Sequence, residues 1–369
     1  MNSANIEKTA LKLGYMPLSD CLPLLIAQEK GFFSQEGLTV ELQQEVSWSN
    51  IRDKVIVGHL DGAHMLAPML FATSLGLGGI KKPLITAFSL GLNGNAFTIS
   101  NQLQSALADV DSNQFDHSNT MKLLIEQRKM AGLPRLVFAT VYPYSCHNLQ
   151  LRYWLASAHI DPDKDIDLVI LPPSQMVDHL KLAHIDGFFA GAPWNSVAIL
   201  QGHGHCLLTG MDIWENAPEK VLGVTLEWAE KNPNTHSAVI RALHEACQWL
   251  ELHAEEALPL LEQHLSLNSP LINRNCLIPA ITGKNIFTQQ SKQSKAPSLL
   301  VFNHSMANFP WLSHGQLICA QMKRWHWLPD DVDNEQLVAS CYRPDIYRQA
   351  LTHLEMPNDN FHSTHLAIL

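Results

Sequence analysis

The sequence predicts an α/β protein of two lobes around a cleft, with an additional helical region at the C-terminal end. Three observations support this prediction. Strand-like and helix-like segments alternate in the first half of the chain, the alternation resumes after an extended segment at 95–101, and the chain becomes largely helical from Asn234. A chain of 369 residues is also long enough to form more than one core.

The first α/β unit contains short apolar strands separated by amphipathic helices. Residues 10–16, 38–43, 63–66 and 83–90 have strand patterns, and residues 22–33 and 50–60 have helical patterns. Pro68 occupies a position that suits the first turn of a further helix. Strand–helix–strand alternation predicts a parallel or mixed sheet with helices on both faces.

The second unit repeats this alternation, with helices predicted at 119–132 and 147–158 and strands at 135–141, 167–171 and 186–190. We therefore assign residues 10–100 and 221–369 to lobe 1, including the helical C-terminal region, and residues 101–220 to lobe 2. Ligands of open α/β sheets bind beyond the carboxyl ends of the strands, which predicts a ligand cleft between the lobes. Closure of such a cleft is a hinge motion driven by ligand contacts.

Composition excludes several classes of function. The formal net charge of −10 argues against direct nucleic-acid binding, although a small anion needs only local positive potential. No run approaches the roughly 20 apolar residues of a membrane span, so we expect no membrane partner. The N-terminal stretch lacks a signal-peptide pattern, and the seven scattered cysteines suggest neither a disulfide framework nor a zinc site. We expect a cytoplasmic protein.

The stretch 47–69, SWSNIRDKVIVGHLDGAHMLAPM, places indole, hydroxyl and amide groups where the predicted elements meet. This composition is typical of the rim of a pocket for a small polar ligand. No phosphate-binding GxxxxGK[ST] loop occurs, so the chain is not an ATPase. Ser145, Cys146 and His147 are adjacent in sequence, whereas nucleophile and base normally meet through the fold. We therefore expect no enzyme activity, no cofactor and no metal.

Long segments between about 11 and 265 resemble the nitrate- and bicarbonate-binding proteins of ABC transporters. They include GYMPLSDCLPLLIAQEKGFF (14–33), SWSNIRDK (47–54), LNGNAFTISN (92–101), YPYSCHNLQLRYWLASAHIDPDKD (142–165), DGFFAGAPWN (186–195) and PEKVLGVTLEWAEKNP (218–233). The resemblance implies the two-lobed type II periplasmic-binding-protein fold. Among its branches, the chain is most similar to the cytosolic NasS-type nitrate sensors.

The resemblance also implies a set of nitrate or nitrite contacts, at Trp48, Gln102, His147, Gly191 and Lys220. Nitrate is flat and singly charged, and its site needs donors, positive potential and no nearby carboxylate. Lys220 would supply charge, His147 a donor near a helix N-terminus, and Trp48 an indole N–H and a flat wall. Gln102 would supply an amide, and Gly191 would let the backbone approach the ligand.

Each of these five residues also has a purely structural alternative, such as a solvated lysine or a core tryptophan, and only the resemblance decides against it. Ala192 departs from the family's GEPWN pattern, in which a glutamate often stands at this position. The loss of that acidic group weakens a metal-assisted, bicarbonate-type site and leaves an anion site intact.

Three classes of function compete. The main prediction is a cytoplasmic nitrate/nitrite sensor that sequesters and releases a response-regulator-like RNA-binding antiterminator of nitrate assimilation genes. The alternative is the solute-binding component of a nitrate, nitrite or bicarbonate ABC transporter. An enzyme related to hydroxymethylpyrimidine synthases is the third, and the nitrate-type landmarks argue against it.

Overall fold

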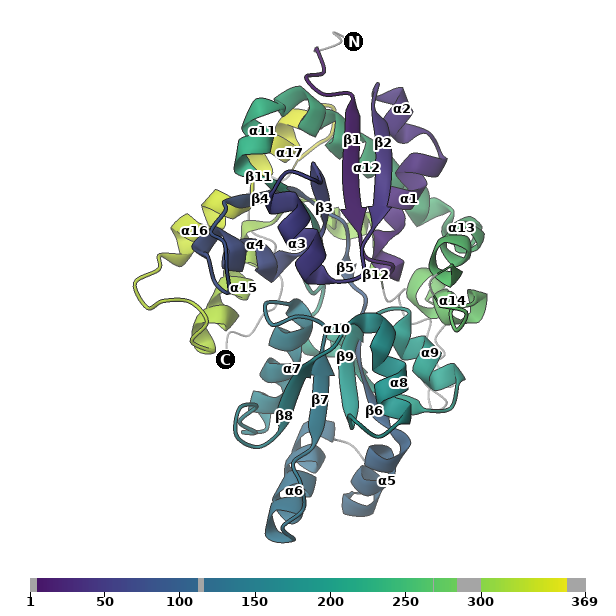
Figure 1. Cartoon of the computed structure of the whole chain (residues 1–369), viewed down its shortest axis with the longest axis vertical. Helices are drawn as coiled ribbons and strands as arrows, with labels where there is room; N and C mark the ends of the chain where they lie inside the picture. Colours follow the sequence, from purple (N-terminus) through teal and green to yellow (C-terminus); the bar gives the residue numbers. More distant parts are fainter. Residues whose placement is uncertain (1–4, 112–115, 268, 284–299, 357–369) are drawn as a thin grey trace.

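The protein folds into two lobes, each with a central β-sheet covered by helices (Figure 1). The computed structural model describes residues 5–111, 116–267, 269–283 and 300–356. Parts of the range 221–369, which we assigned to lobe 1, lie outside the described residues. The predicted α/β architecture is confirmed, and both sheets are mixed.

The sheet of the first lobe has the strand order β2-β1-β3-β11-β4. β1 is parallel to β2 and β3, whereas β11 enters between β3 and β4 and is antiparallel to both. A strand from late in the chain therefore completes a sheet begun at the N-terminal end. The strands are β1 (Ala10–Tyr15), β2 (Thr39–Gln44), β3 (Gly62–Leu66), β4 (Leu84–Ser89) and β11 (Lys220–Thr225).

The sheet of the second lobe has the order β10-β6-β9-β7-β8. β7 is parallel to β8 and β9, and β6 is antiparallel to β9 and β10. The strands are β6 (Asn95–Ser100), β7 (Val137–Thr140), β8 (Asp167–Ile170), β9 (Gly187–Gly191) and β10 (Gly204–Thr209).

Helices before the C-terminal region cover the two sheets. Those of the first lobe are η1 (Ser19–Cys21), α1 (Leu22–Glu29), α2 (Phe32–Gln35), α3 (Trp48–Ile56), α4 (Ala67–Leu75) and α11 (Leu226–Lys231). Those of the second lobe are α5 (Asn101–Val110), α6 (His117–Met130), α7 (Cys146–Ser157), η2 (Pro173–Gln175), α8 (Met176–Lys181), α9 (Trp194–Leu200) and α10 (Gly210–Ile213).

The chain crosses between the lobes at 90–94 and again at 214–219. A two-stranded ribbon of β5 (Leu92–Asn93) and β12 (Leu300–Val301) lies at the first crossing. The sheets correct the boundaries predicted at 100/101 and 220/221. β6 belongs to the second sheet and starts at Asn95, and Lys220 already belongs to the first sheet.

The C-terminal helices pack against both lobes and not only against lobe 1, in which we had placed them. α12 lies on α1 and α2 of the first lobe, whereas α14 contacts α9 and α15 contacts α7 in the second. These helices are α12 (Pro233–Leu252), α13 (Ala254–Ser266), α14 (Arg274–Thr282), η3 (His304–Met306), α15 (Leu312–Arg324), α16 (Asn334–Cys341) and α17 (Pro344–Ala350). They therefore bridge the two lobes along the outside of the molecule (Figure 1).

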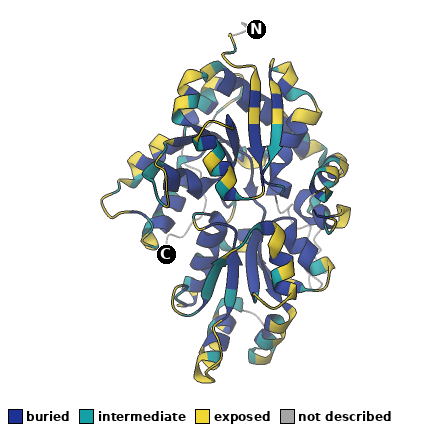
Figure 2. Cartoon of the chain, in the orientation of Figure 1, coloured by how far each residue is buried: buried dark blue, intermediate teal, exposed yellow. Residues whose placement is uncertain are grey.

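Five strands of the two main sheets are buried along their whole length. Every residue of β3, β4, β6, β9 and β11 is buried, and the dark interior of each lobe in Figure 2 follows these strands. A single cluster of buried apolar side chains extends from the first lobe into the second. Among the described residues, no helix is both long and apolar enough to cross a lipid bilayer.

Candidate functional site

Polar side chains from both lobes meet around Lys220, the first residue of β11. The ammonium Nζ lies 2.9 Å from Asp20 Oδ2 on η1, and it donates to the carboxylate of the adjacent Glu219. From the second lobe it faces Asn95 Oδ1 and His147 Nε2, each at 3.4 Å. We call these five residues the Lys220 cluster. All five are at most 4% exposed, so electrostatic interactions among them are little screened by water.

The first residues of two helices reach the site because serine caps fix where the helices begin. The Ser47 hydroxyl accepts from the backbone N–H of Asn50, so that α3 starts at Trp48. The Ser145 hydroxyl accepts from the backbone N–H of Asn148, so that α7 starts at Cys146 and His147 lies in its first turn. An N-terminal first turn is a favourable place for an anion.

Hydrogen bonds tie the lobes together at this point. The Asn95 amide donates to Glu219 and, at 3.1 Å, to Gln150 Oε1 on α7. The backbone N–H of Ser19 donates to the carbonyl of Ala192, which follows β9. The first turn of η1 is thus held against the end of the second sheet, beside Gly191.

The two imidazoles of the site differ in their surroundings, and that of His147 is held in a neutral form. Lys220 can only donate, so His147 Nε2 is the acceptor and the proton lies on Nδ1. Burial, followed by the charge of Lys220, lowers the pKa of His147 well below its ordinary value. His64 Nδ1 accepts the backbone N–H of Met16, and His64 Nε2 lies 3.1 Å from Asp20 Oδ1.

The two carboxylates beside Lys220 differ in acidity. Burial opposes ionisation of Asp20, but Lys220 and His64 hold its pKa below the usual range. For Glu219 burial dominates, and the pKa is raised despite Lys220. Burial would lower the pKa of Lys220, but Asp20 and Glu219 raise it, so the ammonium stays charged. Asp20 is therefore the permanent counter-ion, and Glu219 is the weaker acid of the pair.

Several buried side chains at the site carry a polar atom without a hydrogen-bond partner among the described residues. They include the possible donors Ser19 Oγ, Trp48 Nε1 and His147 Nδ1, and also Asp20 Oδ1 and His64 Nε2, which lie 3.1 Å apart. Trp48 packs against His64, with ring centroids 5.4 Å apart, and His64 in turn contacts Asp20. Buried donors without a partner are uncommon, since each costs about 1–3 kcal/mol. They are suited to a ligand that offers acceptors.

The one thiol described at the site, that of Cys146, is not activated as a nucleophile. Cys146 is buried beside Glu219, and burial raises the pKa of its thiol well above the ordinary value. A protonated, inaccessible thiol is a poor nucleophile and a poor metal ligand. The arrangement can hold a small polar molecule.

The structure brings together four of the five residues predicted from the sequence: Trp48, His147, Gly191 and Lys220. A Cβ added at Gly191 would lie 3.5 Å from Lys220 Nζ and 3.6 Å from Asn95 Oδ1. Gln102 is the exception, because it lies exposed on the first turn of α5. Asn95, in the same LNGNAFTISN segment, brings its amide to the cluster instead.

Sequence reasoning missed the acidic side of the site. We expected no carboxylate near the anion, yet Asp20 and Glu219 both contact Lys220. Asp20 lies in the GYMPLSDC segment and Glu219 in PEKVLG, and an acidic residue within such an apolar run is a signal that could have identified them. His64 sits in a fully buried strand and gave no signal beyond that.

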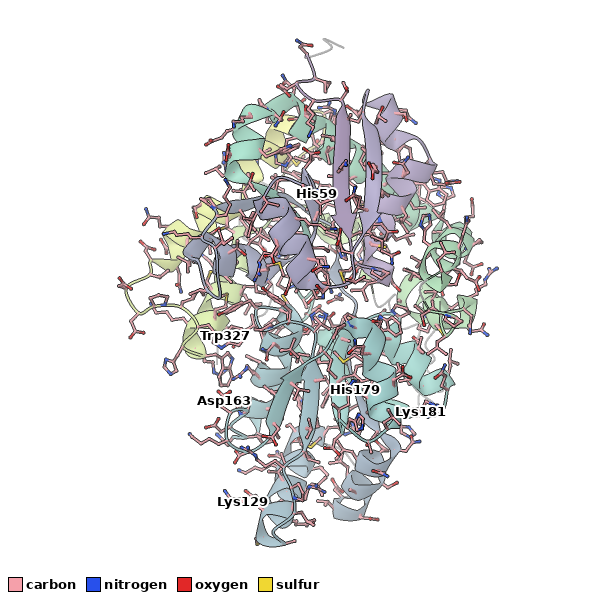
Figure 3. All side chains as sticks on the ribbon, viewed as in Figure 1. His59, Lys129, Asp163, His179, Lys181 and Trp327 are labelled. Carbon is pink, nitrogen blue, oxygen red and sulfur yellow. The ribbon has the colours of Figure 1, made fainter. Side chains whose placement is uncertain are left out.

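A second interlobe contact lies where α15 meets α7. The Arg152 guanidinium forms two hydrogen bonds to Asp163, at 2.6 and 2.9 Å, and lies over the rings of Trp325 and Trp327. Figure 3 labels Trp327 and Asp163 on this side of the second lobe. The same helix α7 carries His147 in its first turn, so the C-terminal region supports a helix of the site.

Comparisons with known proteins agree on the family. Residues 4–261 match the NMT1-like family. The nitrate/nitrite binding protein NrtA of Synechocystis sp. is 30% identical over 97% of this chain and 79% of its own length. The crystal structure of the periplasmic nitrate-binding protein NrtA from Synechocystis PCC 6803 superposes with a TM-score of 0.85 at 28% identity, covering 98% of this chain and 92% of that one.

A different kind of protein is more similar in sequence. The nitrate import ATP-binding protein NrtC of Synechocystis sp. is 39% identical over 97% of this chain, but the match covers only 52% of NrtC. The chain thus spans about half the length of that relative.

Proposed function

The chain belongs to the NMT1-like family, and on that premise we propose that it binds a small planar oxyanion, nitrate or nitrite, at the Lys220 cluster. The observation that carries the proposal is the set of three buried donors without a partner among the described residues, Ser19 Oγ, Trp48 Nε1 and His147 Nδ1, beside a buried ammonium. A bound oxyanion would give these donors an acceptor. The similarity to NrtA, a nitrate/nitrite binding protein by name, supports the same ligand.

We propose first that the chain acts as a solute-binding component, which captures the anion for a transporter. The full-length similarity to NrtA supports this role. Residues of both lobes contribute to the Lys220 cluster, so an anion held there would favour the closed arrangement of the lobes.

A cytoplasmic sensor is the second candidate, which the resemblance of the quoted segments to NasS-type nitrate sensors implies. In this role the ligand-free protein would sequester an RNA-binding antiterminator, and the anion would release it. The anion can shift partner binding only by its differential affinity for the two states.

Calorimetric titration with nitrate and nitrite tests the binding proposal. We expect saturable binding of one anion per chain and a marked loss of affinity in His147→Ala. His59→Ala is the matched control, since His59 is exposed in the first lobe away from the cluster (Figure 3). Absence of binding to either anion, or equal affinity in both variants and the wild type, would refute the site.

Affinity capture from a lysate of the native host, with and without nitrate, separates the two roles. Recovery of transporter subunits would support a solute-binding component. Recovery of a response-regulator-like RNA-binding protein only without nitrate would support the sensor.

A further inference from the structure

The hydrogens of Lys220 are already engaged. An ammonium has three hydrogens, and four acceptors lie around this one: Asp20 Oδ2, Glu219 Oε2, Asn95 Oδ1 and His147 Nε2. The two carboxylate contacts are the shortest of the four. For Lys220 to donate to an anion, its hydrogen bond to one of these four acceptors must break.

Glu219 is the acceptor that can be replaced, because its surroundings suit a neutral carboxyl group. It is 2% exposed, and it faces the adjacent Lys220, Asp20 on η1 and the uncharged amide of Asn95 on β6. The thiol of Cys146 on α7 and the phenol of Tyr342, which follows α16, also face it. Among these groups Lys220 is the single cation, and Asp20 already pairs with it.

The net charge of the Lys220 cluster also indicates that Glu219 is the acceptor that can be replaced. With Glu219 ionised, the Lys220 cluster has one positive and two negative charges, since His147 accepts a hydrogen from Lys220 and burial lowers its pKa. Adding an anion would bring a third negative charge into a site shielded from water, at a high cost in desolvation. Adding a proton together with the anion leaves the buried net charge unchanged.

We propose that the protein binds its oxyanion together with one proton, which forms an O–H bond on the carboxylate of Glu219. This inference rests on the proposed anion-binding function. The proton comes from solvent, and the neutral carboxyl no longer needs a hydrogen from Lys220, which turns to the anion. Asp20 stays ionised as the counter-ion, so the bound state contains Lys220, Asp20 and the anion as its charges.

His147 is less suited to take the proton. His147 Nε2 faces the Lys220 ammonium, which opposes a second positive charge. The raised pKa of Glu219 agrees with its role as the weaker acid of the site, and burial is the main cause.

Nitrate titrations in two buffers of different ionisation enthalpy, over a range of pH, test the proposal on the full chain. The buffer dependence of the observed enthalpy gives the number of protons taken up. We expect uptake to approach one proton per nitrate where free Glu219 is ionised. The Kd should then rise up to tenfold per pH unit.

Glu219→Gln keeps the size and polarity of the side chain and should abolish both the proton uptake and the pH dependence of the Kd. Glu36→Gln is the matched control, since Glu36 pairs with Arg241 away from the site. Nitrate binding without proton uptake in the wild type would overturn this inference and leave the proposed function standing. Uptake that persists in Glu219→Gln would overturn the assignment to Glu219. Failure to bind nitrate at all would refute the proposed function, and this inference with it.

Discussion

Replacing Gly191 by alanine probes the Lys220 cluster without removing any of its groups. The new Cβ would lie 3.5 Å from Lys220 Nζ, 3.6 Å from Asn95 Oδ1 and 3.7 Å from Asp20 Oδ2, which are ordinary contact distances. Gly191 ends β9 in a backbone conformation that alanine also adopts, since its φ is not positive. The substitution should therefore raise the stability of the free protein by about 0.4–1 kcal/mol, through the reduced entropy of the unfolded chain.

The same methyl group should weaken anion binding. An oxyanion must approach Lys220 Nζ to about 2.8 Å, and a carbon at 3.5 Å occupies one side of that atom. Loss of one charge-assisted hydrogen bond costs roughly 1.5–3 kcal/mol, which corresponds to a Kd about tenfold to a hundredfold higher.

Nitrate calorimetry combined with thermal unfolding measures both effects on one protein. Gly37→Ala is the opposite control, because Gly37 has a φ of 75° with no neighbour within 4 Å of the added Cβ. It should lower the free energy of unfolding by about 1 kcal/mol and leave the Kd unchanged. A Gly191→Ala protein of normal stability and normal nitrate affinity would show that the anion does not bind beside Lys220.

Three further predictions follow from the contacts of particular side chains. Lys220→Met should lower the free energy of unfolding in denaturant at neutral pH by about 3–5 kcal/mol, because it leaves two buried carboxylates without their cation. A loss below about 1 kcal/mol would contradict the ion-pair geometry. In calorimetry, Gln102→Ala should leave the nitrate Kd unchanged, whereas Asn95→Ala should raise it. The reverse result would show that Gln102, the residue predicted from the sequence, contacts the anion and that Asn95 does not. Asp163→Asn should lower stability by less than about 1 kcal/mol, because Asp163 is largely exposed. The hydrogen bonds that Asp163 accepts from Arg152 lower its pKa, so this small contribution is present at neutral pH and is lost as the pH falls through the folded pKa. An equal effect of Asp163→Asn on unfolding in acid and at pH 7 would contradict this prediction.

The sequence predicted the α/β alternation because each strand is short, apolar and bounded by turn residues. It could not predict that β11 inserts between β3 and β4, because that pairing joins residues far apart in the chain. The lobe boundary was misplaced for the same reason. β6 looks like a crossing segment in sequence, and only its pairing with β9 and β10 assigns it to the second sheet.

At the site, four of the five residues implied by the resemblance lie together, whereas Gln102 lies apart and the amide of Asn95 joins the Lys220 cluster. Asn95 and Gln102 are close in sequence, but one begins a buried strand and the other lies on an exposed helical turn. Asp20 and Glu219 were not predicted as part of the site, because an acidic side chain in the sequence does not indicate that it is buried. Asp20 and Glu219 became visible only when the fold placed them against Lys220.

A crystal structure determined with nitrate tests the central claim most directly. The account predicts a planar ion between the lobes, within hydrogen-bond distance of Lys220 Nζ and of Trp48 Nε1 or His147 Nδ1. The ion should lie beside Gly191. Nitrate bound elsewhere, for example in the basic pocket of about 240 Å³ that includes Arg128 and Arg135, with Lys220 still donating to both carboxylates, would contradict the account.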